Sequence, residues 1–248
     1  MDQASPYHVW PAPHALSGAL GEFRSSAPGA DFAELCSRFP SEWRIYSMGG
    51  LLRDLLLEQL NGVHVDPGDL DLVIDGAPSR EAVWARLGAS YRRRNSFGGA
   101  KCRLHPGGPM FDVWRIEDHT NMSEAPTPHT IEQLLRHNLL DVDAILWDIR
   151  EDCLHDCGCR AAILSHCIDL MGDEGIAPRY LAEQAAHAVL IAFKTGLPLS
   201  ERAHDFVRGA LEAGQGDAML RIVRRKLLRA VRHVEHFMNE RFAGAVRS

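Results

Sequence analysis

The feature that most constrains the fold of this chain is a pair of glycines, Gly49 and Gly50, set between two segments of different pattern. Trp43–Met48 before them is rich in aromatic and β-branched residues, which is typical of a strand. Leu51–Leu60 after them has leucines at helical spacing. Asp69–Asp75 alternates polar and apolar residues and is predicted to be a second strand. This order indicates a layered unit of mixed α and β structure.

The rest of the chain divides into a mixed part and a helical part. In the mixed part we expect helices at Ala15–Phe23, Ala30–Phe39, Ser79–Leu87 and Thr130–Leu140, and strands at Lys101–His105, Met110–Ile116 and Ala144–Asp148. Residues 1–13 are predicted to be an arm, Cys153–Cys159 a turn, and Ala161–Met171 fits a helix or a strand. Beyond them, helical patterns cover Tyr180–Thr195, Ser200–Ala213 and Ala218–Arg241. The sequence therefore predicts an α+β domain over residues 1–172, with an arm and short helices over 1–40, and a helical region over 173–248.

Carboxylates lie on one face of the strand that follows the glycines. Asp69 and Asp71 are two residues apart, so their side chains project from the same face. Carboxylates this close repel each other unless a cation lies between them, and Mg²⁺ (or Mn²⁺) suits oxygen ligands of this kind. Asp112, on a strand expected nearby, would complete a site for two ions. We predict these three aspartates as metal ligands and as catalytic residues.

A phosphate site is predicted beside them. Gly49 and Gly50 precede a helix, where backbone N–H groups and the helix dipole favour an anion. Glycines let a phosphate approach the backbone closely. Arg53, in the first turn of that helix, would add charge, with Asp54 as its partner or as a carboxylate at the helix start.

These residues resemble the head domain of class II CCA-adding enzymes and bacterial poly(A) polymerases, within the polymerase-β-like nucleotidyltransferases. That family has G-G-x-x-R-D-x-L-L after a strand, then D-x-D-L-V, which resemble Met48–Leu56 and Asp69–Val73. Its F-G-x-x-K and I-D-V segments resemble Phe97–Lys101 and Phe111–Val113. The resemblance covers about residues 43–170. It implies a nucleotidyltransferase-type mixed sheet with flanking helices, followed by an all-helical region.

The resemblance also assigns roles. Asp69 and Asp71 would ligate the metals, and Asp112 would help to activate the acceptor hydroxyl. Gly49, Gly50 and Arg53 would hold the triphosphate. Arg136 would bind the nucleotide, because it stands in a segment similar to the family's D-L-x-R-R-D-F-T-I-N-A motif. The acidic pair of the family's base-selecting E-D-x-x-R motif has no counterpart.

We therefore expect a nucleotidyltransferase that moves a nucleoside monophosphate from an NTP to an RNA 3′ end, as in tRNA, and releases pyrophosphate. A protein or small-molecule acceptor is the first alternative. A non-catalytic nucleotide-binding or RNA-binding protein on a degenerate head domain is the second. Which NTP is used, and the oligomeric state, stay open.

Charge is unevenly distributed along the chain. The net charge is −6, yet the segment from Met219 onward holds eight basic residues against two acidic ones. This asymmetry predicts a local basic surface that would attract RNA, or else a solvated helix face. The candidate RNA-binding residues are Arg224, Arg225, Arg229 and Arg232.

Composition is that of an ordinary globular protein. No apolar run approaches the ~20 residues that a membrane span needs, and the first residues do not resemble a secretory signal. We expect a cytoplasmic protein with reduced thiols and without a membrane partner. Cys153, Cys157 and Cys159 leave a zinc site as an alternative to ordinary buried cysteines, although their spacing is not that of usual structural zinc.

Overall fold

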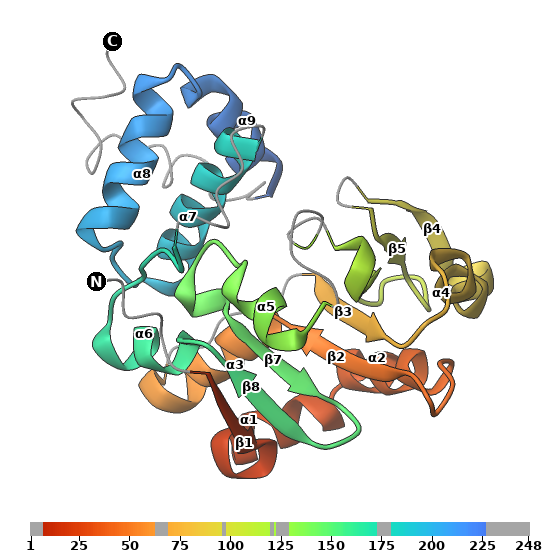
Figure 1. Ribbon diagram of the computed structural model, residues 1–248. Helices are drawn as coiled ribbons and strands as arrows, with labels where there is room; N and C mark the ends of the chain where they lie inside the picture. Colours follow the sequence, from red (N-terminus) through yellow and green to blue (C-terminus); the bar gives the residue numbers. More distant parts are fainter. Residues whose placement is uncertain are drawn as a thin grey trace.

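The strands form a single mixed sheet with helices on both sides (Figure 1). The structure is a computed structural model and describes residues 7–62, 69–95, 98–119, 122, 129–172 and 180–226. Eight strands of the described part lie in the order β1-β8-β7-β2-β3-β6-β5-β4. Their bounds are β1 His8–Pro11, β2 Arg44–Met48, β3 Leu70–Asp75, β4 Tyr91–Arg94, β5 Ala100–Cys102, β6 Phe111–Arg115, β7 Ile145–Asp148 and β8 Cys153–Asp156.

One face of the sheet is covered by three N-terminal helices. These are α1 (Ala12–Ser25), α2 (Ala27–Ser37) and α3 (Gly50–Asn61). Every second residue of β3 points into this core, which confirms the face predicted for Leu70, Leu72 and Ile74. Helix α4 (Arg80–Leu87) packs beside them, and its first turn is capped by the Ser79 hydroxyl, which accepts a hydrogen bond from the N–H of Ala82.

The opposite face of the sheet is only partly covered. A second, smaller core there contains Tyr46 and Val73 from the sheet, with Leu134 and Leu135 from helix α5 (Ile131–Arg136). Helix α5 begins with a capping box between Thr130 and Gln133. The part of this face that α5 leaves open carries the polar residues discussed below.

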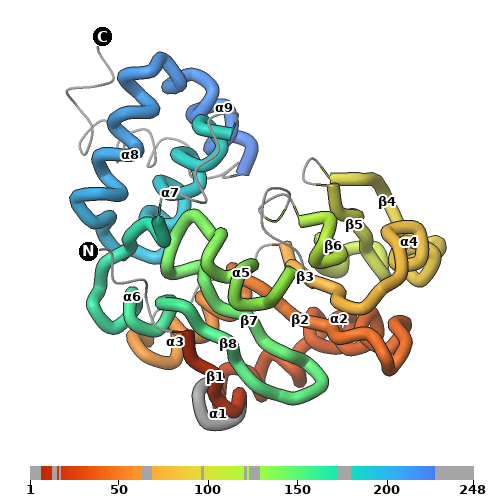
Figure 2. The backbone as a smooth tube through the Cα atoms, viewed as in Figure 1, coloured from red at the N-terminus to blue at the C-terminus, as the bar shows by residue number. Residues whose placement is uncertain are grey.

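The helical region packs beside the sheet rather than upon it (Figure 2). It comprises α7 (Leu181–Thr195), α8 (Glu201–Glu212) and α9 (Gly216–Lys226), and the short α6 (Cys159–Ser165) packs against α3. The apolar side of α9, with Met219 and Val223, is buried against the same large core as α7. No helix among the described residues is long and apolar enough to span a membrane.

The predicted fold class is confirmed: a mixed sheet with flanking helices is followed by helices alone. The predicted strands and helices are present, with shifted ends. The largest shortening affects the helix predicted over Thr130–Leu140, which ends at Arg136. The undecided segment Ala161–Met171 starts within helix α6. The helix predicted over Ala218–Arg241 is described as far as Lys226, and the remainder lies outside the described residues.

Two predictions near the edge of the sheet were wrong. Residues 8–11 are strand β1 and not part of an arm, and residues 153–156 are strand β8 and not part of a turn. The two strands pair with each other antiparallel, from His8 opposite Asp156 to Pro11 opposite Cys153. Each is four residues long. Among the described strands β1 pairs with β8 alone, far away in the sequence, whereas β8 also pairs with the preceding strand β7. The predicted turn begins only at Asp156, whose carboxylate accepts hydrogen bonds from the N–H groups of Gly158 and Cys159.

Candidate active site

The predicted catalytic aspartates lie together on the open face of the sheet. Strands β3 and β6 are parallel neighbours, and Asp71 is directly opposite Asp112. Asp69 precedes β3 by one residue and its side chain is 54% exposed, whereas that of Asp112 is 10% exposed. Residues opposite each other in a sheet project from the same face. The three carboxylates therefore form one cluster, as the spacing and the expected neighbouring strands predicted.

Electrostatic repulsion within this cluster is strong. Burial raises the pKa of Asp71 well above its usual range, and the charges of Asp112 and Asp69 raise it further. Burial of a carboxylate beside two others disfavours its charged form. The cluster would therefore be stabilised by added positive charge, which is the chemistry of a cation site.

Lys101 supplies part of that charge, and sequence reasoning did not single it out as a site residue. Its ammonium nitrogen donates to Asp69 Oδ2 at 2.7 Å and to Asp112 Oδ2 at 2.5 Å. Burial alone would lower the pKa of Lys101, but these hydrogen bonds to Asp112 and Asp69 outweigh burial and raise it. The available signal was its position between two buried residues of β5, Ala100 and Cys102, which places a lysine on the opposite face of the strand.

Two further residues hold Asp112 and the start of β5 in place. Asn95 donates a hydrogen bond from Nδ2 to Asp112 Oδ1 at 2.9 Å. Its Oδ1 accepts the N–H of Gly99. A Cβ on Gly99 would lie 2.4 Å from the ring of Trp114, so only glycine fits there. Trp114 is therefore buried beneath the turn that carries the site.

The metal ligands predicted for this site are chemically suitable. Among the described residues, no three His, Cys, Asp or Glu side chains are gathered closely enough to hold a metal ion as they stand. The Lys101 ammonium lies between Asp69 and Asp112 instead. Three carboxylates opposed by one ammonium still leave an excess of negative charge. Oxygen ligands with such an excess suit Mg²⁺ or Mn²⁺.

The glycine turn lies at the same end of the inner strands as the aspartates. Strand β2 ends at Met48, opposite Asp71, and Gly49 follows with φ of +66°. That conformation favours glycine. The N–H of Gly49 donates to the carbonyl of Ile145, so it is not one of the bare donors expected there. Any anion would be bound by the N–H groups that begin with Gly50, the first residue of α3, which have no partner within the helix.

Arg53 differs from its predicted role. Its side chain is 3% exposed, and its guanidinium is shared between two carboxylates rather than presented to a phosphate. Nε donates to Asp54 Oδ1 at 2.9 Å, and Nη1 donates to Asp143 Oδ1 at 2.5 Å. Asp54 is thus its partner, as one of the two predicted alternatives proposed. The structure makes Arg53 a residue that positions α3.

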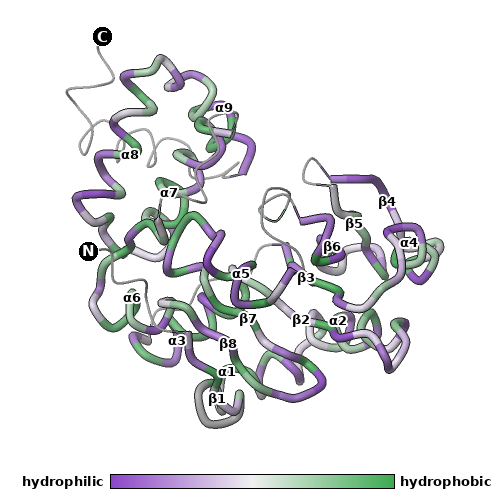
Figure 3. The backbone as a smooth tube through the Cα atoms, in the orientation of Figure 1, coloured by the Kyte–Doolittle hydropathy of each residue, from purple (hydrophilic) through white to green (hydrophobic). Residues whose placement is uncertain are grey.

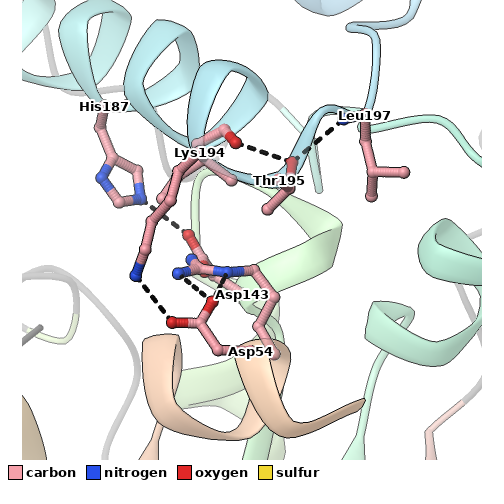
Figure 4. Close-up of polar contacts among 8 residues, drawn as sticks. Asp54, Asp143, His187, Lys194, Thr195 and Leu197 are labelled. Carbon is pink, nitrogen blue, oxygen red and sulfur yellow. Dashed lines mark hydrogen bonds and ion pairs between the residues drawn. The ribbon is translucent and has the colours of Figure 1, made fainter. Parts of the chain in front are cut away.

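The same buried cluster reaches the helical region. From α7, His187 Nε2 lies 2.7 Å from Asp143 Oδ2, and Lys194 Nζ donates to Asp54 Oδ2 at 2.7 Å (Figure 4). Burial alone would raise the pKa of Asp143, but the charges and hydrogen bonds of Arg53 and His187 outweigh it and hold that pKa well below its usual range. The helix that starts at the glycine turn is therefore tied to α7 by alternating charges.

The other predicted site residues are placed as follows. Arg136, the last residue of α5, is half-buried and donates from Nη2 to Glu132 Oε1 at 2.8 Å. Arg224 and Arg225 are exposed in the last turn of α9. Arg229 and Arg232 lie outside the described residues. Lys226, also in that last turn, is close enough for its charge to act on Asp71.

The cysteines considered for a zinc site belong to no group of three possible metal ligands among the residues that the structure describes. Cys153 is in β8, with Sγ 3.6 Å from His155 Nε2, while Cys157 and Cys159 are buried. Burial raises the pKa of the Cys157 thiol to about 11 and that of Cys159 well above its usual value. Burial thus favours the neutral thiol form of both residues in the metal-free protein.

Comparison with known proteins finds similarity in structure but not in sequence. No protein-family model and no curated protein sequence matches this chain. A Bacillus stearothermophilus CCA-adding enzyme in complex with CTP superimposes with a TM-score of 0.63 at 19% identity, over 89% of this chain and 54% of that one. A Thermotoga maritima CCA-adding enzyme complexed with tRNA gives 0.59 at 17% identity, over 94% and 54%. Another CCA-adding enzyme with CTP gives 0.63 at 17%, over 95% and 54%.

The matches cover almost all of this chain and about half the length of each enzyme. At this coverage they extend over both the mixed sheet and the helices beyond it, which is the arrangement that the sequence resemblance implied. At this level of identity the similarity concerns the backbone alone. The chain therefore has the fold of CCA-adding enzymes.

Proposed function

We propose that this protein is a metal-dependent nucleotidyltransferase that transfers a nucleoside monophosphate from an NTP to the 3′ end of an RNA. The proposal rests on one observation: Asp71 is opposite Asp112, Asp69 lies beside them, and the glycine turn is at the same end of these strands. It brings carboxylates for a metal next to a helix start for phosphates. The fold of CCA-adding enzymes supports the same chemistry.

Each group has a defined task in this reaction. The acceptor 3′ hydroxyl attacks the α-phosphate in line, its proton passes toward Asp112, and pyrophosphate leaves. Asp69 and Asp71 would hold the divalent ions, which neutralise the triphosphate and make the hydroxyl more acidic. The N–H groups at the start of α3 would bind the β and γ phosphates. Asn95 and Lys101 keep the Asp112 carboxylate oriented.

RNA is the acceptor that we favour, and tRNA is the form found with the similar Thermotoga enzyme. The supporting observation is the placement of α9. Its exposed basic turn ends at Lys226, which is near enough for its charge to lower the pKa of Asp71. Such charge attracts a polyanion more strongly than a neutral small molecule.

The test is transfer of label from each α-³²P-labelled NTP, with Mg²⁺ or Mn²⁺, into total RNA, proteins or small molecules of a cell lysate. The Asp69→Ala/Asp71→Ala double variant serves as the inactive protein. Asp75→Asn is the matched control, because Asp75 lies on the same strand and face but outside the cluster. We expect the label in RNA with the wild type and the control, and none with the double variant.

The other outcomes decide between the alternatives. Label in protein or in a small product, lost in the double variant, would keep the chemistry and reject the RNA acceptor. If no NTP gives a label that is lost in the double variant, the proposal that the protein is an enzyme is rejected. A nucleotide-induced rise in melting temperature that survives the double substitution would then favour a non-catalytic binding protein.

Removing the Lys101 charge is expected to tighten metal binding. Because the ammonium bonds to Asp69 and Asp112, it competes with a divalent ion for the same oxygens. We expect Lys101→Met to bind Mn²⁺ about tenfold more tightly than the wild type, which corresponds to loss of a competing contact of ~1.4 kcal/mol. Binding is measured by electron paramagnetic resonance of free Mn²⁺, without nucleotide.

Lys101→Arg keeps the charge and should bind Mn²⁺ within about twofold of the wild type. Weaker Mn²⁺ binding by Lys101→Met would contradict the competition and would assign Lys101 to support of the metal site.

A further inference from the structure

Strand β4, at the edge of the sheet, carries three consecutive arginines. Arg92, Arg93 and Arg94 are all exposed, and none of them forms an ion pair with another described residue. The strand is among the most hydrophilic segments of the chain (Figure 3). Arginines on an edge strand can simply prevent pairing with other chains. The register of β4 shows that they are not equivalent.

Arg93 belongs to the row that contains the catalytic aspartates. It is opposite Lys101 of β5, Lys101 is opposite Asp112 of β6, and Asp112 is opposite Asp71 of β3. Residues opposite one another across strands project from the same face. The side chain of Arg93 is therefore on the open face of the sheet, two strands from Asp112.

Arg94 is on the other face. It is opposite Ala100, which is opposite Val113, and both of these are buried in the core beneath the helices. The two neighbouring arginines thus carry the same charge and are both exposed, but they point to opposite sides of the sheet. Arg92 lies at an irregularity in the pairing of β4 with β5, so its direction does not follow from the register.

Arg93 and the glycine turn lie at opposite ends of this row of paired residues. The glycine turn follows Met48, at the end of the row away from Arg93. Neighbouring strands are ~4.8 Å apart, so Arg93 lies about 10 Å from Asp112 and about 19 Å from Met48 along the row. Phosphates bound at the glycine turn are thus beyond the reach of Arg93, while the acceptor side of Asp112 is within it.

An RNA that presents its 3′ hydroxyl to Asp112 places its own phosphates at such a distance. Successive nucleotides of a stacked strand rise by ~3.4 Å, so a phosphate two or three nucleotides back lies about 7–10 Å from the hydroxyl. A guanidinium is planar and matches phosphate oxygens with two parallel hydrogen bonds. The basic turn of α9 supplies positive charge in addition.

We infer that Arg93 binds a backbone phosphate of the acceptor RNA, two or three nucleotides from the 3′ end, and so guides the strand across the sheet edge at β4. This inference rests on the proposed function, because it takes the acceptor to be RNA. It makes Arg93 a positioning residue, since it lies too far from Asp112 to touch the reacting atoms.

The test compares Arg93→Gln with Arg94→Gln, which removes the same charge from the opposite face. Binding of a fluorescein-labelled RNA hairpin with a single-stranded 3′ end is measured by anisotropy, with EDTA and without NTP, over a range of salt concentrations. We expect Arg93→Gln to weaken binding about tenfold at low salt and to reduce the slope of log K against log salt by about 0.7–0.9, as for loss of one phosphate contact. Arg94→Gln should bind within twofold of the wild type, and both variants should melt like it.

Equal loss in the two variants, or no loss in either, would overturn the inference and leave the arginines as protection of the sheet edge. No RNA binding by the wild type would overturn it as well. Because these measurements need no chemistry, they are separate from the label-transfer test. If the wild type transfers label to RNA and Arg93→Gln binds the RNA as tightly as the wild type, only the role of Arg93 is rejected.

Discussion

Replacing Asp71 with asparagine is expected to lower nucleotide transfer by at least about 1000-fold while raising the melting temperature of the metal-free protein. Loss of one ligand of a catalytic metal removes several kcal/mol of transition-state stabilisation, and each 1.36 kcal/mol is tenfold in rate. The gain in stability follows from removal of a buried carboxylate next to Asp69 and Asp112. A relief of ~1–2 kcal/mol corresponds to about 2–8 °C for a chain of this length.

The stability effect has a defined pH dependence. In the folded protein the pKa of Asp71 is raised above the value in the unfolded chain. Wild-type stability therefore falls as the pH rises from the ordinary aspartate range toward the raised pKa. Asp71→Asn lacks this ionisation, so its advantage in melting temperature should grow with pH in the same window. Scanning calorimetry in EDTA measures both proteins.

Metal addition supplies the control. Mg²⁺ or Mn²⁺ should raise the melting temperature of the wild type and of Asp75→Asn, and should have a much smaller effect on Asp71→Asn. If Asp71→Asn melts below the wild type in EDTA, the aspartates do not repel one another as the structure indicates. If it retains transfer, Asp71 is not a catalytic ligand.

The largest loss of stability is expected from Arg53→Met. This substitution removes the cation shared by Asp54 and Asp143 and leaves two buried carboxylates with fewer partners. Breaking a buried ion pair from one side costs roughly 3–5 kcal/mol. The melting temperature should fall by about 10 °C in calorimetry. Arg208→Met removes an exposed arginine paired with Asp205 and should cost less than about 1 kcal/mol.

The pH dependence of this loss runs opposite to that of Asp71. The folded-state pKa of Asp143 is held below its usual range, so the stability that its ionisation contributes is present above the ordinary aspartate pKa and is lost as the pH falls below it. The gap between the wild type and Arg53→Met should therefore be full at pH 7 and begin to narrow below about pH 5. A gap independent of pH would show that Arg53 stabilises the fold by packing alone.

Local pattern was sufficient for the elements that carry the site. The alternation of residues 69–75 and the glycines after Trp43–Met48 predicted β3, β2 and the turn between β2 and α3, because each of these segments carries its signal in neighbouring residues. Strand β1 could not be predicted, since it is four residues long and pairs only with β8, across most of the domain. Strand β8 also pairs with the nearby β7, but its four residues include no β-branched residue and give no strand signal of their own. Strand β4 was missed because, as an edge strand, it packs only Tyr91 against the core.

The sequence predicted that the three aspartates lie together, but not the contacts that the neighbouring cations make. Asp69 and Asp71 follow from a two-residue period, and Asp112 from the expectation of a neighbouring strand. Arg53 was expected to face a phosphate because it follows a glycine turn. Leucines precede and follow the Arg53–Asp54 pair, so the helix is buried all round and an arginine within it needs buried partners. That signal was present in the sequence.

The pairing of β1 with β8 also affects how the protein can be made. Tyr7 hydrogen-bonds to His155 across 148 residues, and His8 is opposite Asp156. At ~5–20 residues per second, the ribosome needs about 7–30 s to deliver the second strand after the first. During that interval β1 has no strand to pair with, so the outer edge of the sheet is completed last. Contacts so distant in sequence slow folding, because the loop must close before any pairing stabilises it.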